Sequence, residues 1–272
     1  MRRAGGALAG LALLLAACGS AAEPAEIRVS GKFGTIPAVE FSTPIPIEAG
    51  EAHVLTAGSG PVVGDGAPVV LTLTAFSGDD GTLLEGAGTT QVLFATQEDL
   101  GETLLDAVLG VHEGTRLLLT QPVLGGSDRE MVVTVVDVIP TRAVGSTSIG
   151  DERITVRDGA DGAPEISIPH ETMPTGSLEI LQISRGEGEQ VTMGQRVVVQ
   201  YTVWHWSDGS VFDTTWETGV PAVLELDSAF PGVQMGLVDQ PVGSRVLLEI
   251  PPVQGLGTDT LVMVADILAA TD

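Results

Sequence analysis

Runs of aliphatic residues separated by clusters of Gly, Asp and Pro dominate the C-terminal part of the chain. Three runs, at 197–203, 245–250 and 261–268, are rich in Val, Ile and Leu and have the length of strands. The clusters between them are typical of turns. The interval 231–238 leaves room for one helix at most. The segment 191–268 therefore predicts a compact, mainly β domain.

The pattern of this segment occurs a second time upstream. Asp80-Gly81 precedes Asp208-Gly209 by 128 residues, and Gly114-Thr115-Arg116 precedes Gly243-Ser244-Arg245 by 129 residues, so one added residue accounts for the change of spacing. Agreement at two nearly equal spacings indicates an internal duplication. The further correspondences are Gly58-Ser59-Gly60 with Gly186-Glu187-Gly188, Gly66 with Gly194, Pro122 with Pro251, and 132–139 with 261–268, in which Asp137 stands opposite Asp266.

A glycine-rich segment precedes each copy, at 29–41 and at 156–168. Both segments place Gly residues before a Pro and an alternating apolar run, which predicts a short added hairpin or an edge strand. The interval 141–153 is small and polar without apolar periodicity, so it is the expected linker. The expected domains are 27–140 and 154–272, the latter with its core at 178–270.

Several short motifs of the second copy follow one another in a recognisable order. They are Tyr201 in a strand, Asp208-Gly209, Phe212-Asp213-Thr214, Pro221, Val242-Gly243-Ser244-Arg245, Ile250-Pro251-Pro252 and Asp259-Thr260-Leu261-Val262. With these motifs the segment resembles the FKBP-type peptidyl-prolyl cis-trans isomerase domain. The resemblance implies an α+β fold, mainly β, in which an antiparallel sheet wraps around one short helix. Together with the duplication, it implies two FKBP-like domains in tandem.

The resemblance also implies an activity, the isomerisation of Xaa-Pro peptide bonds, and a site in the second domain. Tyr201 matches the strand tyrosine whose hydroxyl orients the substrate, Phe212 the aromatic wall of the pocket, and Asp213 the carboxylate at its edge. Catalysis would be non-covalent, without metal or cofactor. The alternative is that Tyr201 and Phe212 are core residues and Asp213 a turn former. The apolar lining would be completed by Val223, Phe230, Val233, Leu256 and Met263.

Several aromatic residues of the family pattern are replaced in this chain. Val233 stands where the family has the tryptophan of the pocket floor, and Leu256 where it has a tyrosine. Met263 replaces an aromatic residue of the closing strand, and only Thr258 remains of the long loop that normally follows Gly257. The replacements motivate a second hypothesis, a catalytically inactive FKBP-like chaperone or scaffold.

The first copy departs further from the family pattern. Leu73 stands opposite Tyr201, and Leu84-Glu85 stands opposite Phe212-Asp213. The aromatic residues of the expected pocket are therefore absent from the first copy. We expect this domain to be structural or to hold peptides, without isomerase activity.

All three tryptophans of the chain surround the predicted turn at Asp208-Gly209. Trp204, Trp206 and Trp216 would either form an exposed aromatic surface for unfolded peptides or pack beneath the turn. Packing is the favoured alternative, because large aromatic side chains contribute strongly to cores.

The N-terminus has the organisation of a bacterial lipoprotein signal peptide. Two arginines precede an apolar run at 7–17, which is too short to span a bilayer, and Leu15-Ala16-Ala17-Cys18 matches the lipoprotein processing site. Residues 1–17 would be removed, and Cys18 would carry the lipid that anchors the chain to the outer face of the bacterial cell membrane. The alternative is an ordinary cleavage site beside an ordinary cysteine. The segment 18–26 would be a tether.

Charge and residue usage exclude several other functions. The formal net charge of −24 argues against nucleic acid, whose phosphates repel an acidic protein. The four histidines have no metal-ligand spacing, and Lys32 is the only lysine, so neither a metal site nor a catalytic amine is indicated. The expected partners are proline-containing segments of exported proteins, and the membrane through the lipid anchor.

Overall fold

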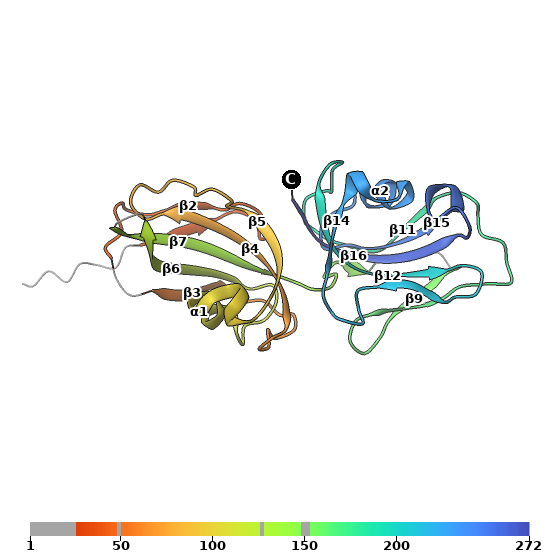
Figure 1. Cartoon of the computed structure of the whole chain (residues 1–272), viewed down its shortest axis with the longest axis horizontal. Helices are drawn as coiled ribbons and strands as arrows, with labels where there is room; N and C mark the ends of the chain where they lie inside the picture. The colour runs from red at the N-terminus through yellow and green to blue at the C-terminus, as the bar shows by residue number, and fades with distance from the viewer. Residues whose placement is uncertain (1–25, 48–49, 126–127, 148–152, 272) are drawn as a thin grey trace, which may run out of the picture.

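The computed structural model describes residues 26–47, 50–125, 128–147 and 153–271. They form two domains that lie side by side, the first on the left of Figure 1 and the second on the right. The expected signal peptide, the lipidation site at Cys18 and nearly all of the tether lie outside the described residues. Within the described ranges, no helix has the length and apolar character needed to cross a membrane.

The first domain contains one sheet, one α-helix and one separate hairpin. Its elements are β1 (Arg28–Ser30), β2 (Ala38–Glu40), β3 (Glu51–Thr56), β4 (Pro68–Ser77), β5 (Thr89–Phe94), α1 (Gln97–Val108), β6 (Arg116–Gly125) and β7 (Asp128–Ile139). The five-stranded antiparallel sheet has the order β3-β6-β7-β4-β5, and β1 pairs with β2 alone.

The second domain has a larger sheet and the same kinds of element. They are β8 (Ser146–Thr147), β9 (Thr155–Asp158), β10 (Pro164–Ser167), β11 (Glu179–Arg185), β12 (Arg196–His205), β13 (Val211–Thr214), β14 (Ala222–Glu225), η1 (Leu226–Ser228), α2 (Pro231–Leu237), β15 (Arg245–Ile250), η2 (Pro252–Gln254) and β16 (Leu261–Thr271). The sheet order is β13-β12-β16-β15-β11-β8, with β14 also paired to β12, and β9 and β10 form the hairpin.

The two sheets share one topology. Strands β3, β6, β7 and β4 of the first domain occupy the places that β11, β15, β16 and β12 occupy in the second. The α-helix precedes β6 in one domain and β15 in the other. This arrangement confirms the predicted fold class, two mainly β domains that each combine an antiparallel sheet with one short helix. The strands predicted at 197–203, 245–250 and 261–268 are confirmed as parts of β12, β15 and β16.

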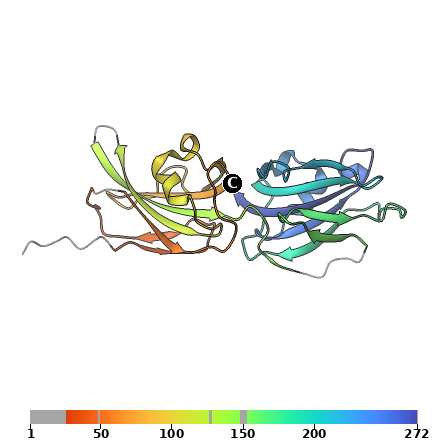
Figure 2. The ribbon, with the colours of Figure 1, turned by 90° about the horizontal axis from the view of Figure 1, so that it is seen from below.

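Each sheet is covered on both faces. Because successive residues of a strand point to opposite sides, Val197 and Val199 of β12 join the core beneath α2, whereas Trp204 joins a second core beneath the β9–β10 hairpin. The first domain repeats this arrangement, and Figure 2 shows α1 and the β1–β2 hairpin on opposite sides of its sheet. Burial on both faces explains why the strands are continuous aliphatic runs.

The segments that precede each copy form hairpins, one of the two predicted alternatives. A buried ion pair fastens the second hairpin to its sheet. Arg245 donates from Nε to Oδ1 of Asp266 at 2.5 Å and from Nη2 to Oδ2 at 2.8 Å. It also donates to the carbonyl of Gly162 at 2.9 Å and to the carboxylate of Asp158, both in the hairpin. These bonds satisfy the guanidinium, as a buried ion pair requires.

The first domain contains the same ion pair. Arg116 donates from Nε and Nη2 to the two carboxylate oxygens of Asp137, at 2.6 and 2.7 Å. Its remaining bonds go to the carbonyls of Gly31 and Lys32 in the turn that follows β1, at 3.0 and 2.7 Å. The repeated Gly-Xaa-Arg motif thus has a structural cause, because its arginine joins sheet and hairpin in both domains.

The tryptophans divide into two buried residues and one that is partly exposed. Trp204 and Trp206 are 7% and 3% exposed within the core beneath the β9–β10 hairpin. The indole Nε1 of Trp206 donates to the carbonyl of Thr172 at 3.1 Å. The packed alternative is therefore confirmed for these two residues, whereas Trp216 keeps part of its surface in solvent.

The connection between the domains is hydrogen-bonded to both of them. Thr141 donates its backbone N–H and its hydroxyl to the carboxylate of Glu113 in the first domain, at 2.8 and 2.7 Å. Two residues later, Ala143 N–H donates to Asp266 of the second domain at 2.9 Å. Strand β8, inside the expected linker, pairs with β11. The domains also share an apolar cluster of Val70, Val92, Ile139, Val198, Leu268 and Ala269.

Candidate functional site

Tyr201, Phe212 and Asp213 lie next to one another on two paired strands. Tyr201 belongs to β12, and the other two belong to β13 at the edge of the sheet. A register shift between Val203 and Trp204 interrupts the pairing, and such bulges re-aim side chains. The Tyr201 hydroxyl donates to Oδ2 of Asp213 at 2.6 Å. The structure therefore brings together the three residues that the sequence analysis selected.

The surroundings of Tyr201 keep its hydroxyl protonated. Burial raises the pKa of the phenol well above its ordinary value, and Asp213 raises it further as a hydrogen-bond acceptor and as a negative charge. The ring packs against the core beneath α2, and the backbone N–H donates to Oγ1 of Thr215 at 2.8 Å. With its proton directed to Asp213, the phenolic oxygen still has lone pairs for a donor on a ligand.

Phe212 presents an aromatic surface beside this hydrogen bond. Its side chain is 45% exposed, although the ring is large and apolar. The rings of His205 and Phe212 are in contact in a T-shaped arrangement, with centroids 5.5 Å apart and planes inclined at 79°. An exposed ring that is supported on one side is suited to contact an apolar group of a ligand.

The predicted apolar lining separates into an exposed part and a buried part. Val223, Phe230 and Leu256 are 46%, 41% and 37% exposed. Val223 does not lie with Tyr201, because its neighbours Ala222 and Leu224 pack on the core beneath α2 and Val223 therefore projects from the other face of the sheet. Val233 and Met263 are 8% and 2% exposed and belong to the core on which Tyr201 packs. Phe230, before α2, and Leu256, after η2, are therefore the exposed part of the predicted lining, and Val233 and Met263 support Tyr201 from the core.

Two glycines seat the helix that carries part of this lining. A Cβ added at Gly232 would lie 2.5 Å from Cγ2 of Ile250, and one added at Gly236 would lie 2.5 Å from Cδ1 of Leu248. Any larger residue would push α2 away from β15. Pro231 starts the helix at a position where its missing N–H costs no hydrogen bond. This close approach fixes Phe230, the residue before the helix.

Several exposed residues close in sequence to the predicted ones could not be identified from a motif. Val211, Met235 and Val253 are 53%, 53% and 88% exposed, and Gln254 Nε2 lies 3.7 Å from Sδ of Met235, which joins η2 to α2. His205 was missed as well, although it contacts Phe212. None of them has a sequence signal of its own, because an exposed Val or a strand His is unremarkable in isolation.

The first domain offers no equivalent of this arrangement. Leu73 packs against the core beneath α1, and Glu85 is exposed in the connection between β4 and β5. Neither a phenol nor an aromatic ring occupies the places of Tyr201 and Phe212. The chemical features of the site are thus confined to the second domain.

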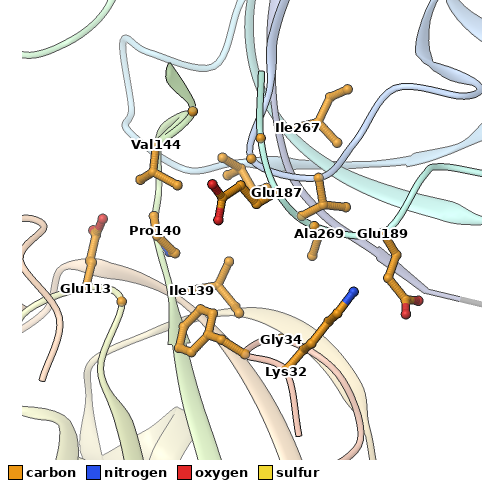
Figure 3. A pocket seen from close by; sticks show the side chains of 18 of the residues that line it. Lys32, Gly34, Glu113, Ile139, Pro140, Val144, Glu187, Glu189, Ile267 and Ala269 are labelled. Atoms are coloured by element: carbon orange, nitrogen blue, oxygen red, sulfur yellow. The ribbon is translucent and has the colours of Figure 1, made fainter. Parts of the chain in front are cut away.

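A separate cavity of about 690 Å³ lies between the two domains. Figure 3 shows Ile139 of the first domain and Ile267 of the second on its walls, with the side chains of Lys32, Glu187 and Glu189 around them. None of the predicted site residues lines this cavity. The charges on its walls have both signs, so they favour neither an anion nor a cation. Within the described ranges, no group of three or more His, Cys, Asp or Glu residues is placed to hold a metal ion.

Comparisons with known proteins concern mainly the second domain. A sequence profile described as FKBP-type peptidyl-prolyl cis-trans isomerase matches residues 187–263. A probable FK506-binding protein of Corynebacterium glutamicum is 31% identical over 116 residues, which cover 39% of this chain and 98% of the relative. An FK506-binding protein of Streptomyces anulatus is 30% identical over 119 residues, which cover 39% of this chain and 95% of the relative. The crystal structure of FkpA from Escherichia coli is 25% identical with a TM-score of 0.34, covering 44% of this chain and 53% of that one.

Proposed function

We propose, from the premise that this chain belongs to the family of FKBP-type peptidyl-prolyl cis-trans isomerases, that its second domain isomerises Xaa-Pro peptide bonds in exported proteins. The observation that carries the proposal is the hydrogen bond of 2.6 Å between Tyr201 and Asp213 beside the exposed ring of Phe212. The site thus places a polar pair next to an apolar ring. Both features are needed to bind a twisted prolyl amide.

The chemistry requires no nucleophile. The barrier to rotation, roughly 18–20 kcal/mol, arises from amide resonance, so a catalyst must bind the twisted amide more tightly than the planar one. A twisted amide has less charge separation than a planar amide. An apolar surface that removes water from the carbonyl therefore stabilises the twisted form relative to the planar form.

The side chains of the site divide this task. Phe212 contacts the proline ring, and the exposed Phe230 and Leu256 extend the apolar contact along the peptide. The Tyr201 hydroxyl orients the substrate backbone, and Asp213 fixes that hydroxyl while forming the polar rim. Val233 and Met263 support the tyrosine from the core.

A protease-coupled proline-isomer assay on residues 20–272 tests the proposal. We expect the chain to accelerate isomerisation of a short Xaa-Pro peptide and expect Asp213→Ala to reduce the rate. Glu85→Ala is the matched control, because Glu85 stands at the corresponding position of the first domain and is also exposed. Rates equal to the uncatalysed reaction would remove the enzymatic function.

The second candidate function is a catalytically inactive chaperone or scaffold. The replacements at Val233 and Leu256 favour it, because the family places aromatic rings at both positions. An aggregation assay with a proline-free client separates the two functions. Protection of that client without isomerase activity supports the inactive chaperone, and isomerase activity without protection excludes it.

The proposed location is the outer face of a bacterial cell membrane, with a lipid attached to Cys18. The support is the order of two arginines, the apolar run at 7–17 and Leu15-Ala16-Ala17-Cys18 in the sequence. Labelling with a radioactive fatty acid tests it, and Cys18→Ala is the control. If the chain with Cys18 intact is released into the medium without label, an ordinary cleavage site is favoured.

A further inference from the structure

His205 lies between the aromatic wall of the site and the segment that leads into β16. Its imidazole contacts the ring of Phe212 edge to face, with centroids 5.5 Å apart. On its other side, Nδ1 is 3.3 Å from Oδ2 of Asp259. The backbone N–H of His205 donates to the carbonyl of Ser210 at 2.9 Å, which holds the end of β12 against the turn. One imidazole therefore connects a carboxylate to the ring that we assign to substrate contact.

Asp259 is held in place independently of the imidazole. Oδ2 of Asp259 accepts from the hydroxyl of Ser207 at 2.7 Å and from the Ser207 N–H at 3.3 Å. The side chains of His205 and Asp259 are 29% and 24% exposed, so solvent screens their interaction only in part. The carboxylate is thus a fixed charge beside the imidazole.

Two other titratable groups lie near this pair. Asp208, in the turn between β12 and β13, has its pKa lowered mainly by hydrogen bonds from Ser210 and to a lesser extent by the charges of His205 and His170. His170 belongs to the segment before β11, and its Nδ1 lies 2.7 Å from the carbonyl oxygen of Trp206. Both carboxylates near His205 are therefore negative neighbours, and His170 is the nearby imidazole that a test must distinguish.

We propose that His205 is a positioning residue for Phe212 and that protonation of the imidazole changes how firmly the Phe212 ring is held; this inference rests on the proposed function. Phe212 is 45% exposed on the edge strand β13, so few other groups restrain its ring. A phenyl ring is negative on its face and positive at its edge, so a charge gained by an imidazole that contacts the ring changes the energy of the contact. The same charge attracts Asp259, which keeps the imidazole in contact. The efficiency of the isomerase should therefore change when His205 becomes charged.

The pH dependence of kcat/KM tests this inference. With an uncharged Xaa-Pro peptide, we expect kcat/KM of the full chain to differ about two- to fivefold between the two ends of the range over which imidazoles ordinarily titrate, about pH 5 to 8. The uncharged peptide is needed because an imidazolium would also act on a charged substrate. His205→Phe keeps a ring against Phe212 without titrating, so its profile should be flat. Asp259→Asn should reduce the change in kcat/KM with pH.

Two histidine variants serve as controls. His53→Gln alters an exposed histidine of the first domain, which lies 3.1 Å from Glu51, and His170→Gln alters the imidazole closest to the site that does not contact Phe212. Both should keep the step in the pH profile. A flat profile of the unaltered chain, or a step that persists in His205→Phe, would overturn the inference and leave the isomerase function standing.

A measurement without substrate separates the inference from the proposed function. The chain has four histidines and six phenylalanines, so NMR signals of His205 and Phe212 can be assigned by substitution. The Phe212 ring signals should change with pH together with those of the His205 imidazole. Ring signals that do not follow His205 would contradict the inference. If the chain shows no isomerase activity, the proposed function fails and this titration still decides the role of His205.

Discussion

The two domains keep one buried framework and differ at the exposed edge of the sheet. Each has an Arg–Asp pair that joins sheet and hairpin, with matching donors and nearly equal distances. At the edge, the second domain has a tyrosine, a phenylalanine and an aspartate where the first has leucines and a glutamate. The comparison teaches that the framework does not depend on the site, because the same topology forms with and without it.

The agreement between the two domains extends to loops whose backbones approach each other closely. A Cβ added at Gly58 or at Gly186 would lie 2.1 Å from a carbonyl oxygen of the facing loop. The N–H of Gly58 donates to the hydroxyl of Thr115 and that of Gly186 to the hydroxyl of Ser244, both at 2.9 Å. These glycines are required by packing in both domains, so their recurrence reflects the fold and not a ligand.

Removal of the buried carboxylates should give the largest effect on the framework. Asp266→Ala removes the buried partner of the Arg245 guanidinium and leaves it only the exposed carboxylate of Asp158. Loss of one partner of a buried ion pair typically costs about 3–5 kcal/mol of unfolding free energy. Asp137→Ala should cost the first domain a similar amount, because Asp137 and Asp266 are 2% and 1% exposed. Chemical denaturation measures both. All three tryptophans lie in the second domain, so fluorescence follows that domain and far-UV circular dichroism follows both.

The control for these variants is an exposed ion pair. Arg28 and Glu26 are 3.0 Å apart, with side chains 69% and 75% exposed, so Glu26→Ala should leave the denaturation midpoint unchanged. A loss of stability in only one of the two aspartate variants would break the comparison, since it would show that the two pairs contribute differently to their domains.

Giving the second domain the residues of the first should remove its activity without unfolding it. The variant Tyr201→Leu, Phe212→Leu, Asp213→Glu loses the ring contact and the polar pair. Loss of a large apolar contact alone is worth about 1.5–3 kcal/mol, or about 10–100-fold in kcat/KM. The isomerase assay measures the loss, and an unchanged tryptophan emission spectrum shows that the fold persists. Activity close to that of the unaltered chain would show that the site lies elsewhere.

Much of the framework could be predicted from sequence because it depends on local patterns. Aliphatic runs bounded by turn residues located β12, β15 and β16, and the two spacings identified the duplication. The motif that contains Tyr201, Phe212 and Asp213 identified residues that the structure joins, because they lie on adjacent strands of one hairpin. Local order along the chain is preserved in such a hairpin.

The remaining features depend on contacts between distant parts of the chain. Thr141 contacts Glu113 and Ala143 contacts Asp266, so the first residues of the expected linker are bonded to both domains although its composition is that of a loop. The contact of His205 with Asp259 also spans two elements, and neither residue belongs to a periodic pattern. Such contacts follow from tertiary packing, which composition and periodicity do not encode.

Restoring one missing aromatic residue should raise activity by a smaller factor. Leu256 is 37% exposed, so Leu256→Tyr adds a ring and a hydroxyl without overfilling the core. One net hydrogen bond to the substrate is worth about 1 kcal/mol, which corresponds to about fivefold in kcat/KM. Val253→Tyr is the control, because Val253 is nearby in η2 but 88% exposed, and it should give no gain. Equal effects of the two variants would argue against a specific place for the tyrosine.

The smallest expected effect is a difference in stability between the domains at alkaline pH. Tyr201 is the only tyrosine, and burial followed by its interaction with Asp213 raises the pKa of its hydroxyl. A raised pKa in the folded state means that the folded domain retains the proton longer than the unfolded chain does. This contribution to the unfolding free energy is complete below about pH 10, where a free tyrosine titrates, and it is lost as the pH rises towards the folded pKa.

Fluorescence-detected denaturation of the second domain should therefore show a decline above about pH 10 that Tyr201→Phe does not show. Because the phenol is only half-buried, the decline should be modest. The first domain contains no tyrosine and serves as the internal reference, with its pH dependence unaffected by the substitution. Identical profiles for Tyr201→Phe and the unaltered chain would mean that the phenol is as free to ionise in the folded domain as in the unfolded chain. In that case the bond to Asp213 would not restrain the hydroxyl, and the assigned role of that hydroxyl in orienting the substrate would lose its physical basis.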